Sequence, residues 1–104
     1  MSTTDARRTE VLLSLQRALL GEVTANLRAV TVRYDDNSIH FEAYFDGAPN
    51  DEEREGMSLV ETEVMADFPS THEVTHEVIR LDAPAPIPKN RTWVYFRKEP
   101  SGPW

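Results

Sequence analysis

Histidines and carboxylates are the residues of this sequence whose types and spacing could do chemistry. His72 and His76 lie four positions apart, a spacing that on a helix could place both rings on one metal ion. The surrounding residues are typical of a strand, where residues four apart are separated by about 13 Å. We therefore expect these histidines to share no metal ion.

A second pair, His40 and Glu42, falls on one face of a predicted strand with about 7 Å between the two residues. A hydrolytic pair is conceivable, but no nucleophile motif or phosphate-binding loop accompanies it. Asp35, Asp36 and Asn37 are typical of a turn rather than of an acidic metal site. The sequence thus predicts no enzyme, no metal and no cofactor.

The acidic residues are concentrated in one part of the chain. Residues 35–82 hold 14 Asp and Glu against Arg54 and Arg80, a balance of −12, whereas the remaining residues have a balance of +5. Such a surface repels nucleic acid and anionic lipid, and it attracts cationic partners and speeds their docking. The plainer interpretation is that the acidity only maintains solubility.

The elements that position these residues follow from hydrophobic periodicity and from helix and turn signals. Thr3 or Thr4 could cap a first helix that ends near Gly21, and Asn50 with Glu53 predicts a capping box for a second helix that reaches about Asp67. Alternating apolar residues predict four strands, at residues 27–34, 39–45, 73–81 and 91–97. Proline-rich residues 82–88 are interpreted as a connector between the last two strands.

This order, α-β-β-α-β-β, predicts an α+β fold: a two-layer sandwich in which both helices cover one face of a four-stranded, mostly antiparallel sheet. The strand order stays open. We expect a core of Leu12, Leu15, Leu19, Val60 and Val64. The other sheet face should be open to water or to a partner, and its expected residues are His40, Glu42, Tyr44, Trp93 and Tyr95.

The 104 residues are expected to form a single domain, with residues 1–4 and 99–104 frayed. The chain lacks cysteine, which fits a reducing compartment, and it has no apolar run long enough to span a membrane. We therefore expect a cytoplasmic protein that binds neither membrane nor nucleic acid directly.

Four segments, SLQRALLGEVTANLRAV, FEAYFDG, ETEVMADFP and EVIRLDAPAPIP, in that order, resemble small immunity proteins encoded beside bacterial polymorphic toxins, including those of contact-dependent growth inhibition. The resemblance covers roughly residues 10–98 and carries no residue-level functional motif. It implies a protein that binds and blocks one cognate toxin domain. Many such toxins are nucleases with basic clefts, which an acidic surface would complement.

Charge and resemblance together predict a partner-binding surface on the second helix and the hairpin before it. Its predicted members are Asp35, Asp36, Glu42, Tyr44, Asp46, Asp51, Glu52, Glu55 and Glu61. The expected partner is the C-terminal domain of the toxin, bound by a monomer or a weak dimer. Two alternatives remain: a small enzyme or ligand-binding domain that uses His40 and Glu42, and a homo-oligomeric subunit.

Overall fold

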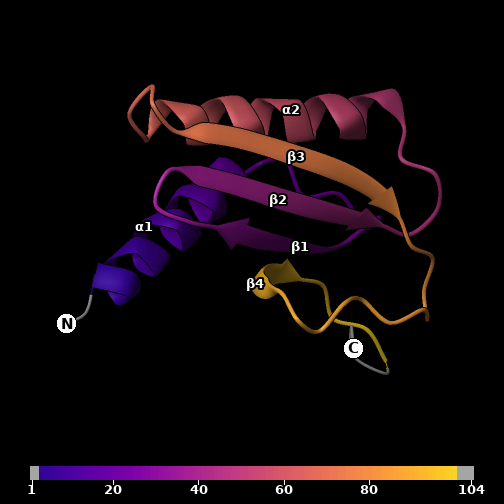
Figure 1. Cartoon of the computed structure of the whole chain (residues 1–104). Coiled ribbons are helices and arrows are strands. Elements are labelled where there is room, and N and C mark those ends of the chain that lie inside the picture. The colour runs from indigo at the N-terminus through magenta and orange to yellow at the C-terminus, as the bar shows by residue number, and fades with distance from the viewer. Residues whose placement is uncertain (1–2, 101–104) are drawn as a thin grey trace.

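Two helices and four strands follow one another in the predicted order, in a computed structural model that describes residues 3–100 (Figure 1). They are α1 (Thr3–Ala18), β1 (Leu27–Tyr34), β2 (Ser38–Phe45), α2 (Asp51–Ala66), β3 (Glu73–Arg80) and β4 (Thr92–Phe96). The predicted α+β class is confirmed. The last two strands are slightly shorter than expected, because β3 ends one residue early and β4 spans only five residues.

The strands form one sheet in the order β3-β2-β1-β4. β1 is antiparallel to both β2 and β4, whereas β2 and β3 run parallel. The parallel pair follows from the chain path, because α2 crosses over between the end of β2 and the start of β3. Figure 1 shows the consequence: α2 lies along β3, at the opposite edge of the sheet from β4.

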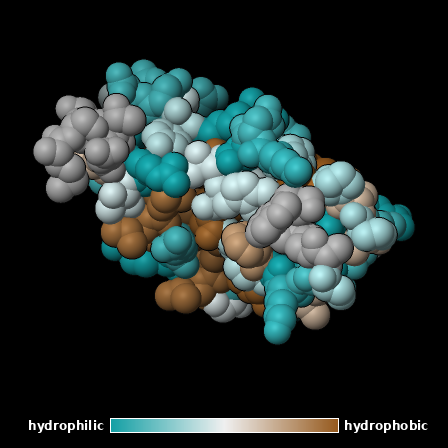
Figure 2. Space-filling view, turned by 90° about the horizontal axis from the view of Figure 1, so that it is seen from below, coloured by the Kyte–Doolittle hydropathy of each residue, from teal (hydrophilic) through white to brown (hydrophobic). Residues whose placement is uncertain are grey.

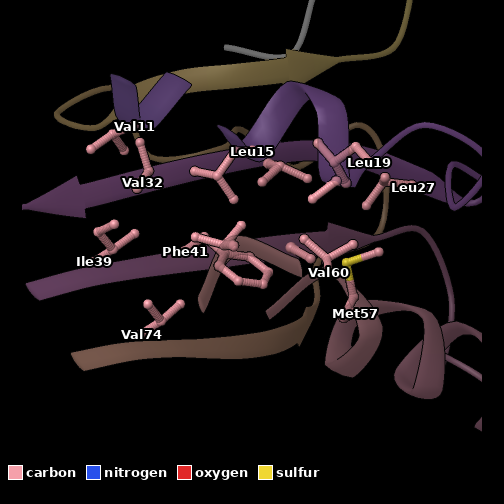
Figure 3. Close-up of a cluster of buried hydrophobic side chains, with 14 of the residues drawn as sticks. Val11, Leu15, Leu19, Leu27, Val32, Ile39, Phe41, Met57, Val60 and Val74 are labelled. Carbon is pink, nitrogen blue, oxygen red and sulfur yellow. The ribbon is translucent and has the colours of Figure 1, made fainter. Parts of the chain in front are cut away.

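Both helices pack on one face of the sheet, as predicted, and enclose the main core (Figure 3). Four of the five expected core residues, Leu15, Leu19, Val60 and Val64, are buried, and Leu12 is partly buried against them. The core is completed by alternate residues of the sheet, among them Leu27, Val30, Val32, Ile39, Phe41, Ala43, Phe45 and Val74. Removing this apolar surface from water stabilises the two-layer arrangement.

The second face of the sheet is not open along its whole length, contrary to our prediction. Part of it is covered by the connection between β3 and β4, whose Ile87 is buried against Ala29 and Tyr44. Tyr44 is consequently only 2 % exposed, and Glu42, which contacts Tyr44, Arg33 and Arg91, is only 6 % exposed. The prediction that they lie on an open face is wrong, because period-2 alternation identifies a face without showing what covers it.

Tyr95 was also expected on that face, but it packs against the helix-side core together with Val94. The register between β1 and β4 explains the difference. Val30 is opposite Tyr95 while its neighbour Thr31 is opposite Trp93, so Val94 is an extra residue in β4. This irregularity shifts the alternation of side chains by one position.

A bulge in β1 positions a fully buried arginine. Leu27 pairs with Phe45 and Ala29 pairs with Tyr44, so Arg28 is the extra residue of β1. Its guanidinium donates two hydrogen bonds of 2.8 Å to the Glu99 carboxylate and two more, also 2.8 Å, to the carbonyl oxygens of Leu81 and Ala85.

The second arginine of this network, Arg97, donates to Glu99 at 2.8 Å and to Asp46 at 2.7 Å. Glu99, expected in a frayed end, is therefore anchored by two arginines; the fraying expected at residues 1–2 and 101–104 lies outside the described residues. The Arg28 hydrogen bond, with a smaller effect from Arg97, lowers the pKa of Glu99 to about 2.

The helix-side core can be tested with two neighbouring positions of α2. Val60→Asp should lower the free energy of unfolding by about 3 kcal/mol or more, since it places an unpaired charge in the core. Leu59→Asp is the matched control, because Leu59 is 49 % exposed and should change stability by no more than about 0.5 kcal/mol. Chemical denaturation measures both variants. Equal effects would contradict the assignment of the buried face.

The pH dependence of stability tests the role of Glu99. Its pKa is about 2 in the folded protein and near 4.5 when unfolded, so its contribution is fully present above pH 4.5 and is lost as the pH falls toward 2. Since one pKa unit is equivalent to about 1.4 kcal/mol, that contribution is about 3 kcal/mol.

Glu99→Gln should therefore destabilise the protein at pH 7 and flatten the decline of stability between pH 4.5 and pH 2. Thermal unfolding across this pH range provides the measurement, with Glu10→Gln on exposed α1 as the control. A variant whose pH profile matches that of the parent protein would show that Glu99 is not held as described.

Candidate partner-binding surface

The second helix begins as its sequence predicts. The Asn50 side chain accepts a hydrogen bond from the Glu53 backbone at 2.7 Å, and the Glu53 carboxylate accepts one from the Asn50 backbone at 3.1 Å. Glu53 also accepts a 2.6 Å hydrogen bond from the Thr24 hydroxyl, and its side chain is buried. Glu53 is thus structural: it fixes the start of α2 and ties it to the connection before β1.

Gly56 is one of the buried residues of α2. A Cβ atom added there would lie 2.8 Å from the carboxylate oxygen of Glu22. The helix therefore approaches the α1–β1 connection closely at this point, and any larger residue would have to displace the flexible end of Glu22.

The outer face of α2 carries acidic residues that nothing neutralises. Asp51, Glu52, Glu55 and Glu63 are exposed and have no ion-pair partner among residues 3–100. These four residues are referred to below as the acidic face. Three of them were predicted from the sequence, and Glu63 is added because it lies two helical turns beyond Glu55 on the same side.

An apolar side chain stands within the acidic face. Leu59 follows Glu55 by four positions and precedes Glu63 by four, so it lies between them on the helix surface. It is 49 % exposed, although leucine is most often buried. Met65, further along the helix, is also half exposed, so both of these apolar residues lie outside the core.

Glu61 lies at the margin of this surface and is partly committed to the fold. Its carboxylate is 2.8 Å from Nδ1 of His76, whose ring stacks on Phe41 with a centroid distance of 5.2 Å. His72, four residues before His76, stacks on Phe68 instead. The two histidines thus have separate surroundings.

The hairpin residues Asp35 and Asp36 are both exposed, at the end of the sheet near the start of β3. The Asp35 carboxylate accepts a 3.0 Å hydrogen bond from the Asn37 backbone, which lowers its pKa, so it stabilises the turn. Its carbonyl oxygen accepts two hydrogen bonds from Arg7 of α1, at 2.8 and 3.1 Å. Asp36 makes no such contact with the described residues.

Asp46 belongs to the Arg28–Arg97 network rather than to the acidic face. It accepts hydrogen bonds from Arg97 at 2.7 Å and from the Ala83 backbone at 3.2 Å, and chiefly the Arg97 bond lowers its pKa. Its charge is balanced within the protein, so it has less to offer a cationic partner than the carboxylates of α2.

Glu42 and Tyr44 form a buried pair. The Tyr44 hydroxyl donates a 2.9 Å hydrogen bond to Glu42, and burial, followed by this bond, raises the pKa of Tyr44. Arg33 and Arg91 each place Nε 3.3 Å from the same oxygen of Glu42. Sequence reasoning missed both arginines. Arg91 depends on a strand order that it left open, and Arg33 lies diagonally across the hairpin from Glu42, opposite His40.

The conceivable hydrolytic pair does not form. Nδ1 of His40 is 2.8 Å from the Thr75 hydroxyl, and its Nε2 is 3.2 Å from Glu77 on β3, whereas Glu42 is held by its two arginines. Within residues 3–100, no three His, Cys, Asp or Glu side chains gather closely enough to hold a metal ion. None of the helices described is long and apolar enough to cross a membrane.

An apolar area occupies a different side of the molecule. Figure 2 shows brown surface on the side away from α2. One apolar hollow of about 220 Å³ is lined by residues of α1, the turn after it and the edge strand β4, and among them Leu20 and Val23 are exposed. The acidic face and this area are therefore separate surfaces with different partner chemistry.

Comparison with known proteins identifies a family for this chain. A search of curated proteins finds no relative of this chain. The family model described as MafI2 immunity protein matches residues 8–99, which is nearly the whole of the fold described above. Since the match includes most of α1, the whole of α2 and all four strands, the chain belongs to the MafI2 immunity protein family.

Proposed function

We propose that this protein neutralises its cognate toxin by covering a basic surface of the toxin domain with the acidic face of α2. Family membership supports the immunity role. The choice of surface rests on a contrast between two groups of acidic residues. Some carboxylates form ion pairs or hydrogen bonds within the fold, namely those of Glu42, Asp46, Glu53 and Glu99. The residues of the acidic face have no ion-pair partner among residues 3–100.

Electrostatics gives the mechanism of this binding. Four carboxylates on one exposed helix surface attract a basic domain over several ångströms and raise its association rate. Carboxylates that become buried against Arg or Lys of the toxin then slow dissociation, with a cost of about 2–5 kcal/mol for truncating one member of such a pair. Pairs that stay exposed at the rim contribute only about 0–1 kcal/mol each.

Leu59 is the apolar anchor of the proposed interface. Tyr44, the aromatic residue predicted for this surface, is buried and cannot contact a partner. Leu59 is exposed at the centre of the acidic face, where a partner could desolvate it while charged pairs form around it. Glu61 lies at the margin of the acidic face and Asp36 lies on the hairpin, so neither is part of the proposed surface.

A nuclease is the toxin class that this surface fits best. The active-site cleft of a nuclease is basic because it binds phosphates, and the carboxylates of α2 would occupy the place of the phosphate backbone. A nuclease acts where nucleic acid lies, so this proposal places the immunity protein in the cytoplasm as a non-catalytic inhibitor. One helix carries the whole surface, so a monomer or a weak dimer suffices.

Charge reversal on α2 tests the proposal. Asp51→Lys, Glu52→Lys and Glu55→Lys, combined in one variant, should lower the rate of association with the cognate toxin domain and weaken its dependence on salt. A second variant, Glu55→Lys with Glu63→Lys, avoids the first helical turn, where lysine also opposes the helix dipole by about 0.3–1 kcal/mol per residue. Stopped-flow or surface-binding kinetics at low and high salt measure the association rate and its dependence on salt.

The matched control is Glu10→Lys with Glu73→Lys, two exposed acids on α1 and at the start of β3. This control changes the net charge as much as the second variant does, so it separates local from overall charge. If both α2 variants associate and protect cells like the parent, the acidic face is only a solvated surface and the toxin binds elsewhere. Leu59→Asp should speed dissociation, because it removes the apolar anchor, without slowing association, because the added carboxylate also attracts a basic domain.

A further inference from the structure

A basic hollow of about 630 Å³ lies at the end of the sheet between β1 and the segment that leads into β4. It is lined by Val32, Arg33, Tyr34, Lys89, Asn90, Arg91 and Thr92. Three of these side chains are cations, three others carry a hydroxyl or an amide, and none is a carboxylate. In a chain with a net charge of −7, such a lining is unexpected.

The strand register brings two of the cations together. Val32 of β1 is paired with Thr92 of β4 in an antiparallel ladder. Arg33 follows Val32 and Arg91 precedes Thr92, so the two arginines lie across from each other at the strand ends. Like charges in directly opposed positions destabilise a sheet unless a counter-charge lies between them.

Glu42 supplies this counter-charge, but its carboxylate carries only one negative charge against two positive ones. The Nε atoms of Arg33 and Arg91 are both 3.3 Å from the same Glu42 oxygen, and the other oxygen accepts the Tyr44 hydroxyl. Two guanidinium groups and one carboxylate leave an excess charge of about +1, and Lys89 raises it to about +2. A buried Glu42 therefore orients the arginines without neutralising them.

Most donors of the two arginines remain available. A guanidinium has five N–H donors. Arg33 uses Nε toward Glu42, and Arg91 uses Nε in the same way and Nη1 toward Asn90. The remaining donors have no acceptor among residues 3–100. Both groups are thus fixed at one end while their other N–H groups face the hollow or solvent.

We propose that this hollow binds a phosphate group, as the free anion or as a monoester. Two guanidinium forks and an ammonium can engage several oxygens of one tetrahedral anion, which matches phosphate better than the two oxygens of a carboxylate. The absence of carboxylates from the lining disfavours a metal cation. The site lies at the β4 edge of the sheet, away from α2, and does not depend on toxin binding.

Titration followed by NMR of the arginine Nε–H signals tests the site on the intact protein. Inorganic phosphate and adenosine monophosphate are the two probes, each compared with sodium chloride at equal ionic strength. Saturable shifts at Arg33 and Arg91 are expected, without matching shifts at Arg28 and Arg97, whose guanidinium groups are already held by Glu99. Tighter binding of the nucleotide would show that the hollow also accommodates the ester group, and equal binding would show recognition of phosphate alone.

Two variants with opposite expected effects on phosphate affinity make the test specific. Lys89→Gln should weaken phosphate binding about tenfold, because it removes one charged donor. Glu42→Gln should strengthen phosphate binding, because it removes the carboxylate that opposes the charges of the two arginines. If Glu42→Gln unfolds, Arg33→Gln is used in its place, and it should weaken binding about as much as Lys89→Gln does. Arg17→Gln is the matched control, since Arg17 is an exposed arginine paired with Asp67 elsewhere.

Three results would overturn the proposal. The first is a response to both probes no larger than that to chloride. The second is an equal loss of affinity in Arg17→Gln, which would indicate general charge screening. The third is unchanged affinity in Lys89→Gln. The toxin-association measurements with the α2 variants are separate, so either proposal can fail while the other stands.

Discussion

The fully buried guanidinium of Arg28 is the constraint on which the second face of the sheet depends. An arginine cannot lose its charge, so burial requires that acceptors be brought to it. The bulge in β1 turns Arg28 toward the β3–β4 connection, and carbonyl oxygens of that connection together with Glu99 satisfy it. The segment that covers Ala29 and Tyr44 is thereby held in place.

This constraint divides the acidic residues into two groups with different roles. Glu42, Asp46 and Glu99 balance arginines that the fold has brought close, so their charges are part of its internal structure. The carboxylates of α2 follow no such requirement: a capping box needs only Asn50 and Glu53, and the dipole needs charge only in the first turn. Glu55 and Glu63 exceed both needs, which is the reason for proposing that they face a partner.

Sequence reasoning predicted the elements well because their signals are local. The Asn50–Glu53 capping box, the Asp35–Asn37 turn and the buried stripe of Val60 and Val64 depend on residues within a few positions of each other. Tyr44 was misplaced because its burial depends on Ile87, and Glu42 because it contacts Arg91; both partners lie more than forty positions along the chain. The pairing of Arg33 with Arg91 could not be foreseen either, because it depends on β4 lying beside β1. Two bulges added to the difficulty, since each shifts the alternation on which face assignments rest.

The strand order also determines how charge is distributed over the whole molecule. α2 lies along β3 at one edge of the sheet, and Arg33, Lys89 and Arg91 gather beside β4 at the other. A basic domain that approaches this protein is attracted at the α2 edge and repelled at the β4 edge, so it is turned as well as attracted. Orientation of this kind raises the fraction of productive encounters without any additional contact in the final complex. The basic hollow therefore does not oppose binding of a cationic partner at α2; it disfavours the reversed orientation.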